Sequence, residues 1–148
     1  MRPSQVREAK AGDLEGVLAL YRDLRPNDPV LSRDSAQEAF AHLLAREGVH
    51  LIVCESDGAL VATCLLAVIP NLASGARPFG VIEHVITLAA HRKRGYGRLV
   101  LQYALDKAWS KNCCKVMLLS GAQRVDAHKL YESVGFKGDI ERGFVVKP

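Results

Sequence analysis

Apolar residues recur with two different spacings along this chain. Spacings of three and four residues, which place side chains on one face of a helix, predict helices at 14–21, 36–44, 97–111 and 127–134. Continuous, partly β-branched apolar runs predict strands at 5–9, 50–55, 60–68, 80–88, 115–119 and within 136–146. The Asp57-Gly58 pair between two of these runs is typical of a β-hairpin.

Residues that commonly cap helices stand at three of the predicted helix starts. Asp13 and Asp126 are the expected N-caps of the first and last helices. Ser35 and Glu38 have the spacing of a capping box at the second helix. Residues 70–78 are rich in turn formers and are expected to form a loop that overhangs a substrate site.

The order of these elements predicts a single α/β domain over residues 1–148, with a mixed sheet. The strand at 80–88, the helix at 97–111 and the strand at 115–119 should form a right-handed parallel crossover. Ligands of such sheets usually bind beyond the carboxyl ends of the strands. Residues 92–97 occupy that place, so they are the first candidates for a binding site.

A basic turn with two glycines connects this strand to the helix and consists of Arg92, Lys93, Arg94, Gly95, Tyr96, Gly97 and Arg98. Its glycines allow the backbone to turn so that successive N–H groups point into one concavity. The helix adds its unpaired N-terminal amides and the positive end of its dipole. The alternative is a solvated strand-to-helix turn, but amides and basic side chains together are typical of a site for a phosphate-bearing anion.

Two familiar phosphate-binding motifs do not fit this turn. A Walker-type loop needs Gly-Lys followed by Ser or Thr, whereas Gly97 is followed by Arg98. A dinucleotide fingerprint needs a third glycine or alanine where Val100 stands. The remaining pattern, Arg-x-x-Gly-x-Gly at Arg92, Gly95 and Gly97, resembles the coenzyme A pyrophosphate loop of the GNAT superfamily of N-acetyltransferases.

The resemblance extends over nearly the whole chain and is sharpest in the C-terminal half. Residues 83–87, Glu-His-Val-Ile-Thr, resemble the Glu-Asp/Asn-Val-Val segment of glucosamine-6-phosphate N-acetyltransferases. Residues 112–116, Asn-Cys-Cys-Lys-Val, resemble their Gly-Cys-Tyr-Lys-Ile segment. Residues 130–136 match the widely shared Phe-Tyr-Glu-x-x-Gly-Phe pattern. The three matches stand in the family's order.

This resemblance implies a GNAT fold, in which a mixed central β-sheet has a splayed parallel strand pair and is flanked by about four helices. It implies acetyl-CoA as co-substrate, with its pyrophosphate on the turn at 92–98 and its pantetheine arm along Val85, Ile86 and Thr87. It implies direct attack of a primary amine on the thioester, with an amino sugar phosphate as the leading acceptor. It also implies a homodimer, for which the apolar tail at 143–146 offers a strand edge.

Tyr131 is the first candidate for catalysis. By the resemblance, it lies near the coenzyme A sulfur and acts as general acid when the thiolate leaves. A phenol with a pKa near 10 protonates a thiolate with a pKa near 8.5 at an uphill cost of roughly 2 kcal/mol. Basic neighbours, or hydrogen bonding to the developing thiolate, must therefore supply the benefit. Spacing alone favours a core aromatic, because Tyr131 continues an apolar helical stripe.

Glu83 is the candidate base, because an amine acceptor arrives mostly as ammonium and must lose a proton. A carboxylate of ordinary pKa is weak in that role, so Glu83 is expected to act through a water or by positioning the amine. The alternative is a charged residue at a strand edge. His84 departs from the Asp or Asn of the sugar-phosphate family; it is either a structural histidine or itself the base.

Two further positions depart from the family pattern. Ala127 stands where many relatives have an Asn that contacts coenzyme A, with His128 and Ser120 as possible substitutes. Lys147 stands roughly where sugar-phosphate relatives have a phosphate-binding Arg. A lysine ammonium cannot donate the two parallel hydrogen bonds that an arginine gives to a phosphate. The alternative for Lys147 is therefore an exposed terminal lysine without a phosphate partner.

Composition narrows the remaining classes. Hydrophobic residues make up 49% of the chain, and no apolar run reaches the ~20 residues of a membrane span, so a cytoplasmic protein without a membrane partner is expected. The five histidines and four cysteines lack metal-ligand spacing, so no metal is expected. The net charge of +4 is modest, and basic residues are not interleaved with exposed aromatics, so no nucleic-acid partner is expected.

Two other functions stay open. One is acetylation of protein lysine or N-terminal amines, and the other is a non-catalytic acyl-CoA-binding sensor. Glu83 and Tyr131 argue against the sensor, since a binding module needs neither. The sequence does not predict which amine is the acceptor. The loops at 26–34 and 70–79, which should shape the acceptor pocket, carry no motif.

Overall fold

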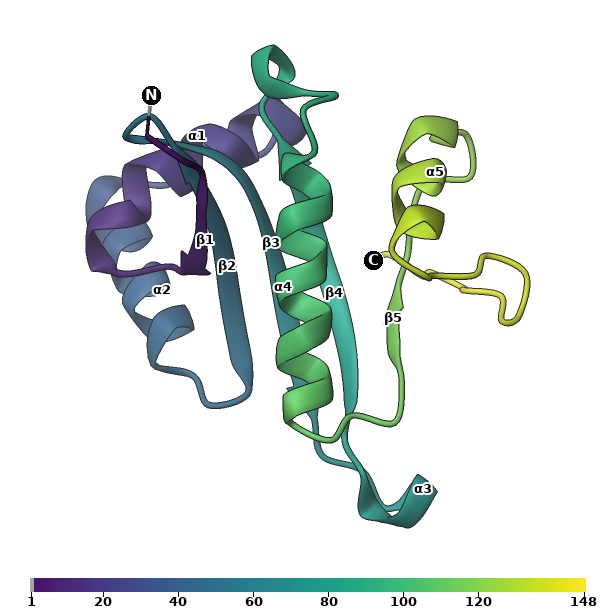
Figure 1. Ribbon diagram of the computed structural model, residues 1–148. Coiled ribbons are helices and arrows are strands. Elements are labelled where there is room, and N and C mark those ends of the chain that lie inside the picture. The colour runs from purple at the N-terminus through teal and green to yellow at the C-terminus, as the bar shows by residue number, and fades with distance from the viewer. Residues whose placement is uncertain (1) are drawn as a thin grey trace.

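The computed structural model describes residues 2–148, and in this range the strands form a five-stranded sheet with helices on both faces (Figure 1). The strands are β1 (Gln5–Glu8), β2 (Val49–Ser56), β3 (Ala59–Ile69), β4 (Phe79–Thr87) and β5 (Val116–Leu118). The helices are α1 (Leu14–Leu24), α2 (Arg33–Ala45), α3 (Ala73–Ala76), α4 (Tyr96–Ser110) and α5 (Val125–Ser133), with 3-10 turns at Ala11–Asp13 and Ala89–His91. Strand order follows the chain; β1 to β4 are antiparallel neighbours and β4 and β5 are parallel, which confirms the predicted mixed sheet.

Side chains of β2 alternate between two cores, one on each face of the sheet. Ile52 and Cys54 belong to the core that contains α4, whereas Leu51 and Val53 pack with α1 and α2. This alternation follows from the two-residue period of a strand. It explains why the run at 50–55 reads as continuously apolar: both of its faces are covered.

The predicted hairpin at Asp57-Gly58 is confirmed. These two residues connect β2 to β3 and have φ angles of 50° and 81°. A two-residue hairpin turn requires this left-handed conformation at both central positions, which Asp and Gly adopt more readily than other residues.

The parallel strands β4 and β5 separate after a short pairing, as predicted. They pair from Gly80 opposite Val116 to Ile82 opposite Leu118, and β4 then continues to Thr87 without β5 beside it. A β-bulge lies at the point of separation, since His84 and Val85 together stand opposite Cys64 of β3. His84 has a φ of 54°, so the bulge redirects β4 where the gap opens.

Helix α4 follows the open part of β4 and completes the predicted crossover. It begins one residue earlier than expected and buries an apolar stripe made of Val100, Leu101, Ala104, Leu105 and Ala108. Its N-terminus faces the same end of the sheet as the carboxyl end of β4 (Figure 1). Within the described chain, no helix combines the length and the apolar character that crossing a membrane demands.

The structure corrects the predicted helix caps. Ser32 caps α2, because its Oγ accepts a hydrogen bond from the Ser35 N–H at 3.2 Å, so the N-cap lies three residues before the predicted one at Ser35. Helix α5 begins after Arg124 rather than at Asp126. Asp13 does precede α1, but its carboxylate accepts from the Lys10 N–H at 2.8 Å and from Arg7 instead of capping the helix.

The structure also corrects two predicted segments. Residues 70–78 contain α3, which lies at the opposite end of β4 from the basic turn and so overhangs no part of the cleft described below (Figure 1). Residues 134–148 contain no strand. Lys115 of the β5 approach reaches Glu141 at 3.4 Å, but Phe144 and Val146 remain 87% and 95% exposed. The apolar side chains of residues 140–146 thus stay exposed, so apolar burial does not favour strand pairing of this segment within one chain.

We expect Asp13→Asn to destabilise the fold. Both terminal nitrogens of Arg7 donate to the buried Asp13 carboxylate, at 2.7 and 3.0 Å, and the Arg7 guanidinium holds the Asp13 pKa below its usual range. Losing this charge should lower the free energy of unfolding at pH 7 by about 1–3 kcal/mol. A lowered carboxylate pKa stabilises the fold above the ordinary value, so the difference should shrink as pH falls below about 4. Urea unfolding at pH 7 and pH 3 measures both effects, and a pH-independent difference would contradict this account.

Candidate active site

A cleft opens between β4 and α5 where β5 no longer pairs with β4. It consists of two adjoining cavities with volumes of about 980 Å³ and 220 Å³. Four side chains line both of them: Leu24, Val85, Arg124 and Tyr131. The cleft therefore has a large and a small compartment that meet beside Val85 and Tyr131.

The larger cavity collects most of the predicted coenzyme A contacts. Its wall includes the predicted β4 residues Val85, Ile86 and Thr87, and six residues of the basic turn, Arg92, Lys93, Gly95, Tyr96, Gly97 and Arg98. Arg94 does not line it, so the predicted contact from that side chain is not supported. Ala127 lines the cavity as well, which places the departure from the family's Asn inside the cleft.

The backbone of the basic turn is suited to an anion. Gly95 has a φ of 85° and precedes α4, and no side chain caps the helix there. Within residues 2–148, the backbone N–H groups of residues 93–98 donate no hydrogen bond. Such free amides at a helix start bind phosphate groups, and the dipole adds to the attraction. The residues present therefore fit a pyrophosphate.

Arg92 and Tyr96 have structural contacts that hold this turn in place. Arg92 donates from Nε to the Thr87 carbonyl oxygen at 3.2 Å and reaches Asp23 of α1 at 3.4 Å. The Tyr96 hydroxyl lies 3.2 Å from Ser56 Oγ. Both contacts connect the turn to rigid elements, so the free amides keep their positions without a ligand.

Gly97 lies where the first turn of α4 meets β4 and α5. A Cβ atom at this position would stand 3.0 Å from Leu130 Cδ2 and 3.3 Å from Thr87 Oγ1, and both of those residues line the larger cavity. Any larger side chain here would therefore narrow the gap between β4 and α5. This close approach explains the second glycine of the motif.

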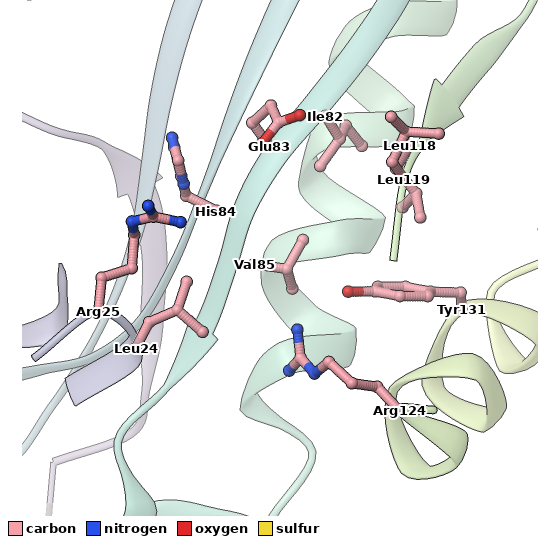
Figure 2. A pocket seen from close by; sticks show the side chains of 10 residues that line it. All are labelled: Leu24, Arg25, Ile82, Glu83, His84, Val85, Leu118, Leu119, Arg124 and Tyr131. Atoms are coloured by element: carbon pink, nitrogen blue, oxygen red, sulfur yellow. The ribbon is translucent and has the colours of Figure 1, made fainter. Parts of the chain in front are cut away.

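The smaller cavity is lined by Leu24, Arg25, Ile82, Glu83, His84, Val85, Leu118, Leu119, Arg124 and Tyr131 (Figure 2). The structure thus brings the predicted catalytic residues Glu83 and Tyr131 into one cavity, from β4 and α5. Figure 2 shows the Tyr131 hydroxyl directed toward Val85 and the interior of the cavity, with Glu83 on the opposite wall.

Tyr131 is held firmly within α5. Its side chain is only 7% exposed, and its ring packs edge-on against Phe136 with the ring centres 6.2 Å apart. Burial raises the pKa of Tyr131, and the positive charge of Arg124 partly offsets this. The hydroxyl therefore keeps its proton at neutral pH and is available as a donor.

Ser120 is a polar group near Tyr131 whose hydrogen bonding is incomplete. Its Oγ is buried and has no hydrogen-bond partner in the part of the chain that the structure describes. It stands close enough to the Tyr131 hydroxyl to lower that pKa, which opposes the effect of burial. His128, the other predicted substitute for the missing Asn, instead approaches the Gly121 carbonyl oxygen at 2.9 Å and lines neither cavity.

Glu83 and His84 differ in their surroundings. Glu83 is exposed in the open cavity and lies opposite Tyr131, where it can meet an incoming ammonium. The His84 ring packs against Tyr21 of α1, with the ring centres 5.2 Å apart. Burial raises the pKa of Tyr21 to about 12, so it remains a neutral partner for that ring. The contact holds His84 against α1 at the bulge, whereas no hydrogen bond or ion pair within residues 2–148 engages the Glu83 carboxylate, which stays open to the cavity.

Sequence reasoning missed Leu24, Arg25 and Arg124, which come from the end of α1 and the residue before α5. No motif marks them, because their place in the site depends on how α1 packs beside β4. Lys147, for which an exposed terminal lysine was the alternative to a phosphate contact, lies in the exposed tail and lines neither cavity. Within the described residues, no three His, Cys, Asp or Glu side chains are grouped to hold a metal ion.

Comparison with known proteins gives consistent matches. The model of the "Acetyltransferase (GNAT) family" matches residues 17–136. A putative acetyltransferase from Agrobacterium tumefaciens has a solved structure with 44% identity and a TM-score of 0.93, over 97% of this chain and 99% of that one. The glucosamine 6-phosphate N-acetyltransferase of Trypanosoma brucei brucei is 27% identical over 90% of this chain and 88% of its own length. The uncharacterized N-acetyltransferase YhdJ of Bacillus subtilis is 43% identical over 56 residues, which are 37% of this chain and 39% of the relative.

Proposed function

The chain belongs to the acetyltransferase (GNAT) family and is an acyltransferase, and we propose that it moves the acetyl group of acetyl-CoA to a small primary amine. Proteins of this family use acetyl-CoA. One observation carries the proposal: the large and the small cavity meet at Tyr131. A thioester and an amine have to meet at such a junction for direct attack.

In this proposal the larger cavity holds acetyl-CoA, which supplies the activated acetyl group. The free amides at 93–98 bind the pyrophosphate, and Lys93 and Arg98 add positive charge. The part of β4 beyond Ile82 lacks β5 as a neighbour, so its backbone is open to pair with the pantetheine arm. The same open edge offers N–H groups to the oxygen that becomes negative during attack, where preorganised donors help most.

The smaller cavity holds the amine. Glu83 accepts a proton from the ammonium, directly or through a water, and positions the nitrogen. The Tyr131 hydroxyl donates to the leaving sulfur. The positive charge of Arg124 beside the phenol helps here, because it works against the effect of burial. An amino sugar phosphate is the leading acceptor, and the name of the Trypanosoma relative supports that choice; protein amines are the second candidate.

The test is a rate assay that detects the free thiol released from acetyl-CoA, run with a panel of small amines and amino-terminal peptides. Release that depends on the amine supports the proposal. A melting temperature that rises with acetyl-CoA shows cofactor binding independently, because a ligand of the native state stabilises it by mass action. Binding without amine-dependent release would favour the acyl-CoA sensor instead.

We further propose that the protein forms a homodimer through its C-terminal tail. Ile140, Phe144, Val145 and Val146 are 68–95% exposed, and β5 is the last strand of the sheet in the described chain. A second copy that adds its tail to this edge would bury those side chains and complete the strand pairing. Sedimentation at micromolar concentration should give twice the chain mass of 16.2 kDa, and Val145→Lys should shift the result toward the mass of a single chain. A wild-type monomer would contradict this proposal.

A further inference from the structure

The smaller cavity carries charges of both signs at separate places. Arg25 follows α1 and Arg124 precedes α5, whereas Glu83 stands on β4. Figure 2 shows the Arg25 guanidinium beside His84 and the Arg124 guanidinium below Val85, with Glu83 above them. Two arginines from opposite sides of the cleft therefore face one compartment of about 220 Å³.

Both guanidinium groups keep donors for a ligand. Arg25 uses Nε for Asp28, at 2.6 Å, and its two terminal nitrogens make no hydrogen bond within residues 2–148. The Arg124 side chain has no hydrogen bond or ion pair in that same range. By contrast, Arg7 uses both of its terminal nitrogens for the carboxylates of Asp13 and Glu55. A planar guanidinium with free N–H groups can donate two parallel hydrogen bonds to a carboxylate or a phosphate.

We propose that the acceptor amine also carries an acidic group, a carboxylate or a phosphate, and that Arg25 and Arg124 bind this group. The inference rests on the proposed acetyl transfer and specifies its substrate class. An ammonium facing Glu83 would pair with its carboxylate, and an anion facing the two arginines would accept hydrogen bonds from their free N–H groups. The small compartment suits an acceptor that is itself small. A neutral amine would leave the Arg124 guanidinium and the two terminal nitrogens of Arg25 without a partner in the site.

Replacement of Arg25 distinguishes an effect on acceptor binding from an effect on cofactor binding. Arg124 lines both cavities and therefore stands within reach of either substrate, whereas Arg25 lines only the smaller one. A loss that appears in the kinetics of the acceptor, and not of acetyl-CoA, identifies the acceptor site.

The experiment compares amines that differ mainly in the acidic group. Glucosamine 6-phosphate is paired with glucosamine for the phosphate, and β-alanine with propylamine for the carboxylate. Acetylation rates at saturating acetyl-CoA should give a kcat/KM at least about tenfold higher for the acidic member of one pair, and the pair that shows it identifies the anion. Arg25→Gln should reduce that preference by roughly 10- to 100-fold, in keeping with a hydrogen-bonded charge pair. Arg25→Lys, which keeps the charge without the fork, should lose less.

Arg22→Gln is the matched control. Arg22 lies one turn earlier on α1, is exposed and lines neither cavity, so its loss removes the same charge from the same helix without changing the preference. The inference is overturned if neutral members react as well as acidic ones, or if Arg25→Gln and Arg22→Gln behave alike. It is also overturned if Arg124→Gln raises the KM for acetyl-CoA and leaves the preference intact, since Arg124 then serves the cofactor alone. Absence of amine-dependent thiol release from all four amines would overturn the proposed acetyl transfer, and this inference with it.

Discussion

Replacement of Gly97 by valine should abolish acetyl-CoA binding. A Cβ at this position already approaches Leu130 and Thr87 at 3.0 and 3.3 Å, and the valine methyl groups would extend into the gap between β4 and α5. The pyrophosphate could then no longer reach the free amides at 93–98. Because several charge-assisted hydrogen bonds are lost together, binding should weaken by at least about 100-fold. Titration calorimetry with acetyl-CoA measures the change directly.

The controls for this variant concern folding. Leu130 has to shift by a few tenths of an ångström to admit any side chain at 97, so the unfolding transition of each variant must be recorded. Gly97→Ala adds the Cβ alone and should bind with intermediate affinity. Gly138→Val makes the same exchange in the tail, where no atom lies within 4 Å of the added Cβ, and should bind normally. Normal affinity in a folded Gly97→Val protein would contradict the assignment of the turn.

The proposed cofactor side of the cleft could be located from the sequence because the features that define it are local in sequence. Gly95, Gly97 and the following helix lie within a few residues, and the physics of a tight turn before a helix N-terminus does not depend on distant parts of the chain. Arg94 was predicted with its neighbours but lines neither compartment of the cleft, since adjacent side chains on a turn point in different directions. Spacing identifies the backbone site and does not determine which basic side chain faces it.

The acceptor side of the cleft was not predictable in the same way. Arg25 and Arg124 are far apart in the sequence and line one cavity only because α1 packs beside β4 while α5 follows the separated β5. Glu83 and Tyr131 were identified by their resemblance to family motifs. Each position has an ordinary structural explanation when its spacing is considered alone. The charges that should select the acceptor therefore appear only in the folded chain.

Two errors in the predicted elements have the same kind of cause. The serine at 35 begins a capping pattern that fits the sequence, but Ser32 three residues earlier satisfies the free helix amide instead. The tail at 136–146 has the apolar content of a strand, yet it forms none, although it contacts Lys115 and Leu119 on either side of β5. Local sequence preference favours both predicted elements, but the contacts available in the folded chain determine which elements form.

Tyr131→Phe should lower kcat by roughly 10- to 1,000-fold, the usual contribution of a positioned general acid. The phenol lies at the junction of the two cavities and is buried against Phe136, so its ring position should not depend on the hydroxyl. The free energy of unfolding should change by no more than about 1 kcal/mol. The Kd for acetyl-CoA should stay close to that of the wild type, because the lost interaction belongs to the transition state. Single-turnover rates with saturating amine measure the chemical step.

Tyr103→Phe is the matched control for this effect. Tyr103 lies on α4, packs against the same core as Tyr131 and lines neither cavity, so the identical exchange there should leave kcat unaltered. Burial raises the Tyr131 pKa above its ordinary value, so ionisation of Tyr131 should cause no loss of rate until the pH exceeds about 10. A Tyr131→Phe variant with the wild-type kcat would show that Tyr131 has only a packing role in the core. The wild-type rate could instead decline from near neutral pH, and the decline could persist in Tyr131→Phe. A group other than Tyr131 would then cause the pH dependence, and Glu83 is the first residue to replace in order to identify it.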